Sequence, residues 1–299
     1  MIEHLTIPRG PFELAADLHR PDDAAPPRAV VLSTPGSSVK EQIGANYASR
    51  LAARGITALT FDPSHQGQSG GEPRDLEDPY RRGEDISYAI DALSTLDGVD
   101  PERIGVLGIC AGGGYAVHTA RTDHRIKAVG TVVPGNIGTA FRGFQPDGPA
   151  AALGELAAAR TEENRTGALT RSNWLPDTLD EAGELTDVDT IQAINYYRTE
   201  RGGHESSTNR RLSRSDSLLL GYDAFHLVEE LLTQPLQVVV AGRRGSTGSY
   251  EDGVRLWELA PNPVDLMVID GAGHYELYDE PRYVDPAVER LTEFFSTHL

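Results

Sequence analysis

The feature that most constrains this chain is a cysteine flanked by small residues, where a short apolar run meets a helix-like stretch. Residues 103–107 read RIGVL, residues 108–113 read GICAGG, and residues 114–120 continue as a helix-like stretch made mostly of small residues. A strand, a sharp turn that carries Cys110, and a helix form the pattern of a nucleophile elbow. Such a turn crowds its neighbours, and glycine at positions 108 and 112 relieves the crowding.

The same turn predicts a reactive thiol at Cys110. Backbone N–H groups and the dipole at a helix N-terminus favour a thiolate. Cys110 is also the only cysteine of the chain, so it forms no internal disulfide. Outside such a motif, a lone cysteine is more often a small buried hydrophobe without reactivity. Within the motif, we interpret Cys110 as the nucleophile.

Length and charge bound the class of protein. The chain has 299 residues and a formal net charge of -18, which suits one large α/β domain or two small ones. The negative charge argues against nucleic acid and against anionic membranes as partners. We find neither a signal peptide nor an apolar stretch long enough to span a membrane. Together with the single cysteine, these features predict a cytoplasmic protein.

Strand-like and helix-like segments alternate along most of the chain. We expect edge strands within residues 1–20, and then strands at 28–33, 56–61, 104–107, 126–133, 236–242 and 265–270, with helices at 41–54, 80–96 and 286–298. This alternation predicts an α/β fold with a mostly parallel central sheet flanked by helices. Residues 135–225 interrupt it, and we interpret them as a helical lid inserted into a core made of residues 1–134 and 226–299.

A thiol nucleophile needs a base nearby, and His274 is the strongest candidate among nine histidines. It follows the last expected strand in the sequence GAGHY, where glycines let a loop fold back across the strand ends. An oxyanion hole needs two N–H donors that converge on one point. We expect one from Ala111 and the other from Ser37, with Ser38 as the alternative. An ordinary Gly/Ser turn at 35–39 is the competing interpretation.

The orienting acid is missing where we expect it. The loop after strand 236–242 reads RRGSTGSYED. Glu251 and Asp252 either reach back toward the histidine or simply cap a helix. Ser246 could instead hold His274 through a neutral hydrogen bond. A Cys–His pair depends less on an acid than a Ser–His pair does, because a thiol is already more acidic.

Four further residues are candidates for contact with a substrate, namely Gly36, His65, Tyr197 and Tyr250. The loop around His65 and the aromatic segment around Tyr197 also fit structural roles. The sequence contains no His-x-x-x-His, no CxxC and no close cluster of metal ligands, so we expect no metal. The Gly-rich run at 108–114 places cysteine where a dinucleotide would require glycine, so we expect no cofactor.

The chain resembles the α/β-hydrolase superfamily over nearly its whole length, and within it the dienelactone hydrolase-like and polyketide transferase group. The resemblance rests on the order nucleophile then histidine and on motifs at 39–42, 61–62 with 67–73, 108–115, 197–202, 273–279 and 283–288. It implies a Cys–His–Asp triad that acts on esters, lactones or thioesters. The acid of that group precedes a threonine that matches Thr247, so its position here holds Ser246.

These observations predict an acyl hydrolase or acyltransferase that uses Cys110 and His274 on a small ester, lactone or thioester, free or carrier-bound, in natural-product metabolism. The alternative is a lyase, cyclase or isomerase in which His274 shuttles a proton and the oxyanion hole stabilises an enolate. A non-catalytic binding protein is the third possibility. A homodimer is expected only because such dimers are common.

Overall fold

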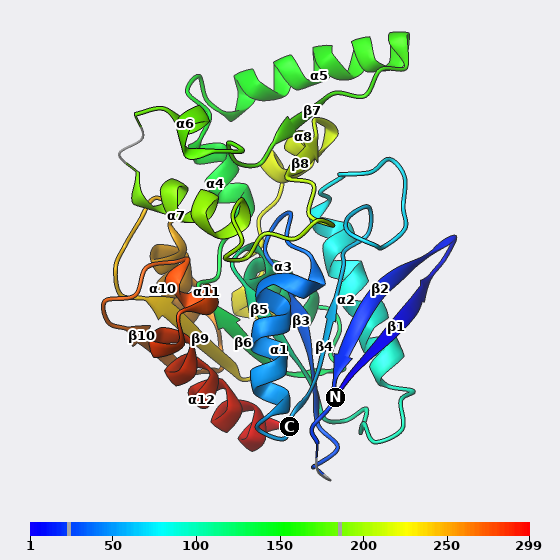
Figure 1. Ribbon diagram of the computed structural model, residues 1–299, viewed down its shortest axis with the longest axis vertical. Helices are drawn as coiled ribbons and strands as arrows, with labels where there is room; N and C mark the ends of the chain where they lie inside the picture. The colour runs from blue at the N-terminus through cyan, green and yellow to red at the C-terminus, as the bar shows by residue number, and fades with distance from the viewer. Residues whose placement is uncertain (23–24, 185–186) are drawn as a thin grey trace.

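The computed structural model describes residues 1–22, 25–184 and 187–299, which form a mixed sheet with helices on both faces (Figure 1). The sheet has eight strands in the order β1-β2-β4-β3-β5-β6-β9-β10. Their bounds are β1 Ile2–Arg9, β2 Phe12–His19, β3 Ala29–Ser33, β4 Thr57–Phe61, β5 Ile104–Ile109, β6 Ile126–Val132, β9 Leu236–Ala241 and β10 Pro263–Ile269. The hairpin β1–β2 pairs antiparallel to β4, and the strands from β4 to β10 run parallel. The prediction of a mostly parallel sheet is confirmed.

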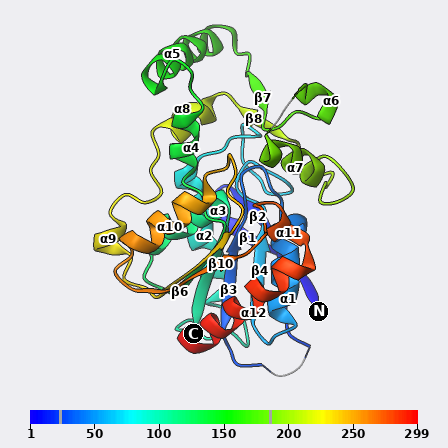
Figure 2. The same ribbon diagram turned by 90° about the vertical axis from the view of Figure 1, so that its left-hand side faces the viewer.

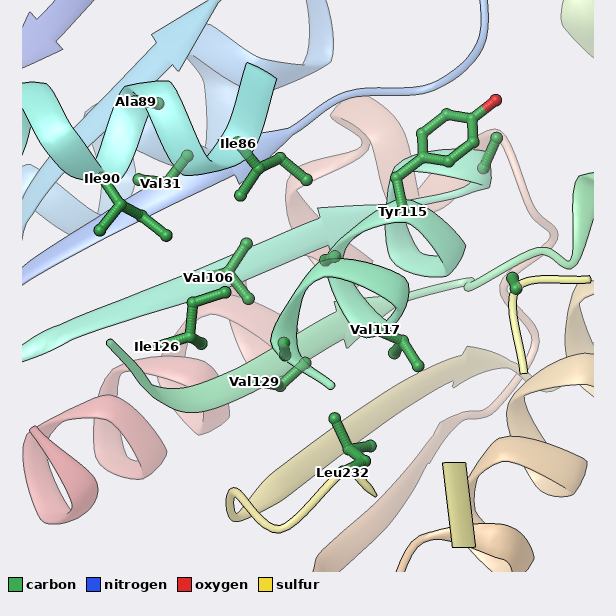
Figure 3. Packing of buried hydrophobic residues seen from close by; sticks show 14 of the residues in the cluster. Val31, Ile86, Ala89, Ile90, Val106, Tyr115, Val117, Ile126, Val129 and Leu232 are labelled. Atoms are coloured by element: carbon green, nitrogen blue, oxygen red, sulfur yellow. The ribbon is translucent and has the colours of Figure 1, made fainter. Parts of the chain in front are cut away.

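Alternating side chains of the strands divide the core into two layers. On one face, Val31 and Val106 pack with α2 (Pro79–Leu93), α3 (Ala111–Ala120) and α10 (Ser249–Leu259). Figure 3 shows Ile86 and Ile90 of α2 lying against these strand residues. On the other face, Val30 and Leu107 pack with α1 (Ala45–Ala52) and α12 (Pro281–His298). Both faces are therefore buried, as parallel sheets require.

Two expected helices differ from the observed ones. The segment expected as one helix at 41–54 is an irregular turn, η1 (Lys40–Gly44), followed by α1, because Gln42 has non-helical backbone angles. The last helix begins at Pro281 rather than at Pro286. Both prolines are compatible with the start of a helix, and the first one takes that position. Pro286 then lies inside the helix.

Residues 135–225 lie at one end of the sheet, beyond the elbow, and contain more than helices. Their elements are α4 Ile137–Gly143, α5 Pro149–Thr166, β7 Arg171–Asn173, α6 Leu179–Ala182, α7 Val188–Tyr197, β8 Arg210–Leu212 and α8 Arg214–Leu220. The antiparallel pair β7–β8 was not expected from the sequence. Both views show α5 projecting away from the sheet (Figures 1 and 2). Two short helices, α9 (Val228–Leu231) and α11 (Glu276–Asp279), complete the described elements.

Candidate active site

Cys110 occupies a strained turn between β5 and α3. Its backbone has φ 55° and ψ -127°, a region that a non-glycine residue rarely adopts. Hydrogen bonds from Cys110 N–H to the Val132 carbonyl (3.0 Å) and from Gly135 N–H to the Cys110 carbonyl (2.9 Å) hold it there. A Cβ added at position 108 would lie 2.4 Å from the Gly112 carbonyl oxygen, and one added at position 112 would lie 2.1 Å from that of Ser33. Only glycine fits at either position, as the motif predicts.

The turn presents Cys110 to an apolar cavity of about 380 Å³. His274, Ala111, Ser37 and Gly36 line the same cavity, and so do Ser246 and Tyr197. Elements from 135–225 supply most of the apolar wall, namely Ile137, Ala140, Phe141, Phe144, Trp174, Leu175, Pro176 and Ala193. The structure thus brings together seven of the nine residues that the sequence indicated.

The other two candidates lie outside this cavity. His65 is buried, with φ 72°, in the loop after β4, and its ring lies 6.0 Å from that of Phe12. Tyr250 packs beneath the Arg244 guanidinium, 4.3 Å from it. Neither is among the residues that line the cavity.

His274 is buried, with 2% of its surface exposed, and both of its ring nitrogens have a partner. Nδ1 lies 2.9 Å from the Ser249 hydroxyl, and Nε2 lies 3.1 Å from the Tyr278 hydroxyl. Burial lowers the pKa of His274 to about 3. The imidazole is therefore neutral at pH 7 and able to accept a proton.

Cys110 is a neutral thiol in this structure rather than the expected thiolate. Burial raises the pKa of the Cys110 thiol, and it outweighs the hydrogen bonds with Tyr278 and with the Ala111 N–H, which act in the opposite direction. The ionised form of Asp252 raises that pKa further. A helix N-terminus favours a thiolate only by a local dipole, and desolvation of the partly buried thiol is the larger effect here.

The residue that bonds Nδ1 of His274, where a triad would have its acid, is Ser249. It was not identified from the sequence. Ser246 lines the cavity, but Nδ1 is bound by Ser249, and the Ser246 side chain instead helps to lower the pKa of Asp187. Ser249 is the first residue of α10, and its hydroxyl also lies 3.2 Å from that of Thr247. Its place two positions after Thr247 was visible in the sequence, but the turn that brings it to His274 was not.

Within the described part of the chain, no carboxylate hydrogen-bonds His274. Asp252 lines the cavity and accepts the Asn136 N–H at 2.7 Å, and burial raises the pKa of Asp252 to about 6. Glu251 is exposed and lies 3.5 Å from Arg244. Asp189, from α7, accepts the Thr247 N–H at 3.0 Å. The carboxylates that were expected to reach back are thus engaged elsewhere.

The loop that carries Ser37 is fixed by a buried arginine that sequence reasoning also missed. Ser37 has φ 60°. Arg82 of α2 donates to the carbonyl of Thr34 and to that of Pro35 (3.2 Å). Its Nε lies 3.5 Å from Glu77, which also accepts the Tyr115 hydroxyl at 2.7 Å. From the inserted region, the Ser207 hydroxyl donates to the Ser37 carbonyl at 2.9 Å.

Two further features of the described residues concern metal binding and membranes. Across residues 1–22, 25–184 and 187–299, no group of three or more His, Cys, Asp or Glu side chains could hold a metal ion. Over the same residues, no helix has the length and apolar character that crossing a membrane demands.

Known proteins resemble this chain in sequence and in fold. It is 38% identical to YcjY of Escherichia coli strain K12 over 93% of this chain and 91% of that protein. It is 25% identical to the acyltransferase drtE of Aspergillus calidoustus (89% and 85% covered) and 26% identical to the thiohydrolase aneE of Aspergillus aculeatus (83% and 79%). The crystal structure of protein PA2218 from Pseudomonas aeruginosa superposes with a TM-score of 0.89 at 29% identity, covering 100% of this chain and 94% of that one.

A family model assigns these shared features to one superfamily. The model described as "Alpha/beta hydrolase family" matches residues 31–287. This stretch runs from β3 to α12 and includes Cys110, the loop that carries Ser37, and His274. The chain belongs to the alpha/beta hydrolase family.

Proposed function

We propose that this member of the alpha/beta hydrolase family is an acyl hydrolase or acyltransferase that cleaves thioesters or activated esters through a covalent adduct on Cys110. The observation that carries the proposal is the cavity itself. It is lined at once by a thiol on a strained elbow, by a buried neutral histidine, and by Ala111 and Ser37. The relatives named acyltransferase and thiohydrolase support the same class of reaction.

The proposed reaction begins with a neutral Cys110 and a neutral His274. Sulfur attacks the acyl carbonyl while His274 takes up the thiol proton, so that the charge is created only as the carbonyl oxygen becomes an oxyanion. The N–H groups of Ala111 and Ser37 would stabilise that oxyanion. The imidazolium then protonates the leaving thiol or alcohol. Water or an acceptor alcohol or amine, activated by His274, releases the acyl group and restores Cys110.

The wall of the cavity indicates the substrate class. The aromatic rings of Phe141 and Trp174, together with Leu175 and Ile137, favour an apolar acyl group. Because these residues come from 135–225, we propose that this region acts as a lid that selects the acyl chain. A thioester suits a sulfur nucleophile, since the attacking and the leaving sulfur are then similar in basicity.

A direct test uses the single cysteine as a mass reporter. The protein would be mixed with the N-acetylcysteamine thioester of butyric acid and quenched in acid, and its intact mass would be measured during turnover. We expect a butyryl adduct in the wild type, no adduct and no turnover in Cys110→Ala, and slow adduct formation in His274→Ala. Turnover that survives Cys110→Ala would contradict the proposal.

The second candidate is a lyase, cyclase or isomerase that uses His274 without covalent chemistry. A neutral imidazole of pKa about 3, with no carboxylate partner in the described structure, fits a proton shuttle as well as a base for a thiol. Cys110→Ala separates the two candidates, because enolate chemistry does not need the sulfur.

A further inference from the structure

Tyr278 lies next to the two groups of the proposed reaction, the Cys110 thiol and the His274 imidazole. Its hydroxyl lies 3.1 Å from Nε2 of His274. All three residues line the same cavity, and Tyr278 is close enough to Cys110 for hydrogen bonding to lower the pKa of the thiol. Within residues 1–22, 25–184 and 187–299, no hydrogen bond joins Cys110 directly to His274. Nε2 of His274 is thus occupied by the phenol of Tyr278 rather than by the thiol, and the same phenol acts on the pKa of the thiol.

The ring of Tyr278 is held firmly in this position. It is fully buried on α11, four residues after His274. The rings of Tyr196 and Tyr275 lie 5.0 Å from it, centroid to centroid, and that of Tyr197 lies at 6.2 Å. Such edge-to-face packing fixes a ring plane and thus the direction of its hydroxyl. The hydroxyl cannot readily turn away from both partners.

A phenol in this environment has the chemical properties of a relay. A tyrosine hydroxyl accepts one hydrogen bond and donates another at the same time. Burial raises the pKa of Tyr278 well above its ordinary value, so the group stays protonated and transfers a proton only if it receives one. The Ser249 hydroxyl at 2.9 Å from Nδ1 can accept the Nδ1 proton, which leaves Nε2 as the acceptor.

We propose that Tyr278 is a catalytic residue that relays the proton between Cys110 and His274. The inference rests on the proposed covalent reaction. As the bond from sulfur to the acyl carbon forms, the thiol proton passes to the Tyr278 oxygen, and the original phenol proton passes to Nε2. The phenol is neutral before and after the step. For protonation of the leaving group, the imidazolium proton returns through the same hydroxyl.

The decisive comparison is Tyr278→Phe with Tyr196→Phe. Both substitutions remove one hydroxyl from a buried tyrosine of the same cluster, but Tyr196 does not line the cavity. The rate of acylation would be measured from the burst of p-nitrophenol released from p-nitrophenyl butyrate. We expect a loss of about 100-fold in Tyr278→Phe, the usual size of an acid–base contribution, with KM within a factor of three, and a wild-type burst in Tyr196→Phe.

A second measurement needs no variant and tests the relay in the native protein. The acylation rate would be followed in mixtures of H₂O and D₂O. The measured rates are first multiplied by the ground-state factor of the thiol, whose deuterium fractionation factor is well below one. Two protons that move in one step then give a quadratic dependence on the deuterium fraction, whereas a direct transfer from thiol to imidazole gives a straight line. A straight line, or a Tyr278→Phe burst as fast as that of the wild type, would overturn the relay.

These outcomes are distinct from a failure of the proposed function. If Cys110→Ala still turns over substrate, the covalent reaction is wrong and the relay fails with it. If Cys110→Ala is inactive while Tyr278→Phe is fully active, the covalent reaction stands, and Tyr278 merely occupies Nε2 until substrate displaces it.

Discussion

The hydroxyl oxygen of Ser249 lies 2.9 Å from Nδ1 of His274, on the side of the imidazole where a Cys–His–Asp triad would place a carboxylate. A hydroxyl can accept the Nδ1 proton and so fix the tautomer and the ring plane. It cannot stabilise an imidazolium as a carboxylate does, because it carries no charge. The histidine is therefore oriented without being made more basic, which agrees with its low pKa.

Replacing Ser249 should slow acyl transfer without abolishing it. A neutral hydrogen bond contributes about 1 kcal/mol, so we expect Ser249→Ala to lower kcat roughly 5-fold. Ser246→Ala should have a smaller effect, because the hydroxyl that bonds Nδ1 of His274 is that of Ser249 and not that of Ser246. Steady-state kinetics on butyryl-N-acetylcysteamine would check this order. A larger loss in Ser246→Ala than in Ser249→Ala would mean that Ser246 holds the histidine.

Removing the charge of Arg82 should disturb the loop that carries Ser37, the expected oxyanion donor. We expect the acylation rate to fall more than the rate of alkylation of the Cys110 thiol. The Arg82 guanidinium holds the carbonyls of Thr34 and Pro35, three and two residues before Ser37. We expect Arg82→Met to slow acylation about 100-fold, in the range found for loss of an oxyanion donor. Alkylation of Cys110 by iodoacetamide needs no oxyanion hole, so that rate should change only a few-fold.

Arg9→Met is the matched control for Arg82→Met. It also breaks a buried ion pair, in this case between Arg9 and Asp85 of α2 at 2.6 Å. In the described structure the Arg9 side chain bonds Asp85 and Glu84 rather than the loop at 34–37. Thermal unfolding of both variants measures the loss of stability. The acylation rate, measured below the lower of the two Tm values, then shows whether the loop that carries Ser37 is disturbed. Equal acylation losses in the two variants would assign the effect of Arg82 to stability alone.

The sequence predicted the parts of the site that depend on local chain geometry. Glycines at 108 and 112 are needed because the turn at Cys110 brings backbone against backbone, and such a requirement is visible in the order of residues. The order of strands and helices likewise follows from their hydrophobic periodicity. Only within 135–225 was a strand pair overlooked, because β7 and β8 are three residues long each.

The contacts that the sequence could not reveal are those between distant elements. Arg82 reaches the loop at 34–35 across 47 and 48 positions, and Ser249 meets His274 across 25. No periodicity links such pairs, since they depend on how α2 and α10 pack on the sheet. The pKa of Cys110 also escaped prediction, because it is decided by burial in the assembled cavity rather than by the helix N-terminus alone.

Asp252→Asn should lower the apparent pKa of Cys110. The carboxylate is ionised above pH about 6 and then raises the pKa of the thiol. Removing the negative charge stabilises the thiolate, so we expect the pH profile of iodoacetamide alkylation to move to lower pH by roughly one unit or less. Glu251→Gln removes a charge from the next residue, which is exposed, and it should leave the profile in place. A shift to higher pH in Asp252→Asn would contradict the assignment.

The buried neutral His274 should make the protein less stable in acid. Its pKa is about 3 in the folded protein and about 6.5 in an unfolded chain. Above pH 6.5 neither state binds the proton. Between pH 6.5 and 3 the unfolded state binds it and the folded state does not, so the free energy of unfolding falls as the pH falls. His274→Asn removes this term and should lose less stability on acidification.

Urea unfolding at pH 7, 6 and 5, followed by tryptophan fluorescence, would measure the difference. Well below pH 6.5, one proton bound only by the unfolded state corresponds to a slope of about 1.4 kcal/mol per pH unit. We therefore expect the free energy of unfolding to change more steeply with pH in the wild type than in His274→Asn. The difference between the two slopes should come close to this value near pH 5. The comparison of slopes is unaffected by any constant loss of stability in the variant. Parallel curves would mean that His274 takes up a proton in the folded protein near its ordinary pKa, and the base of the proposed reaction would then be charged below pH 6.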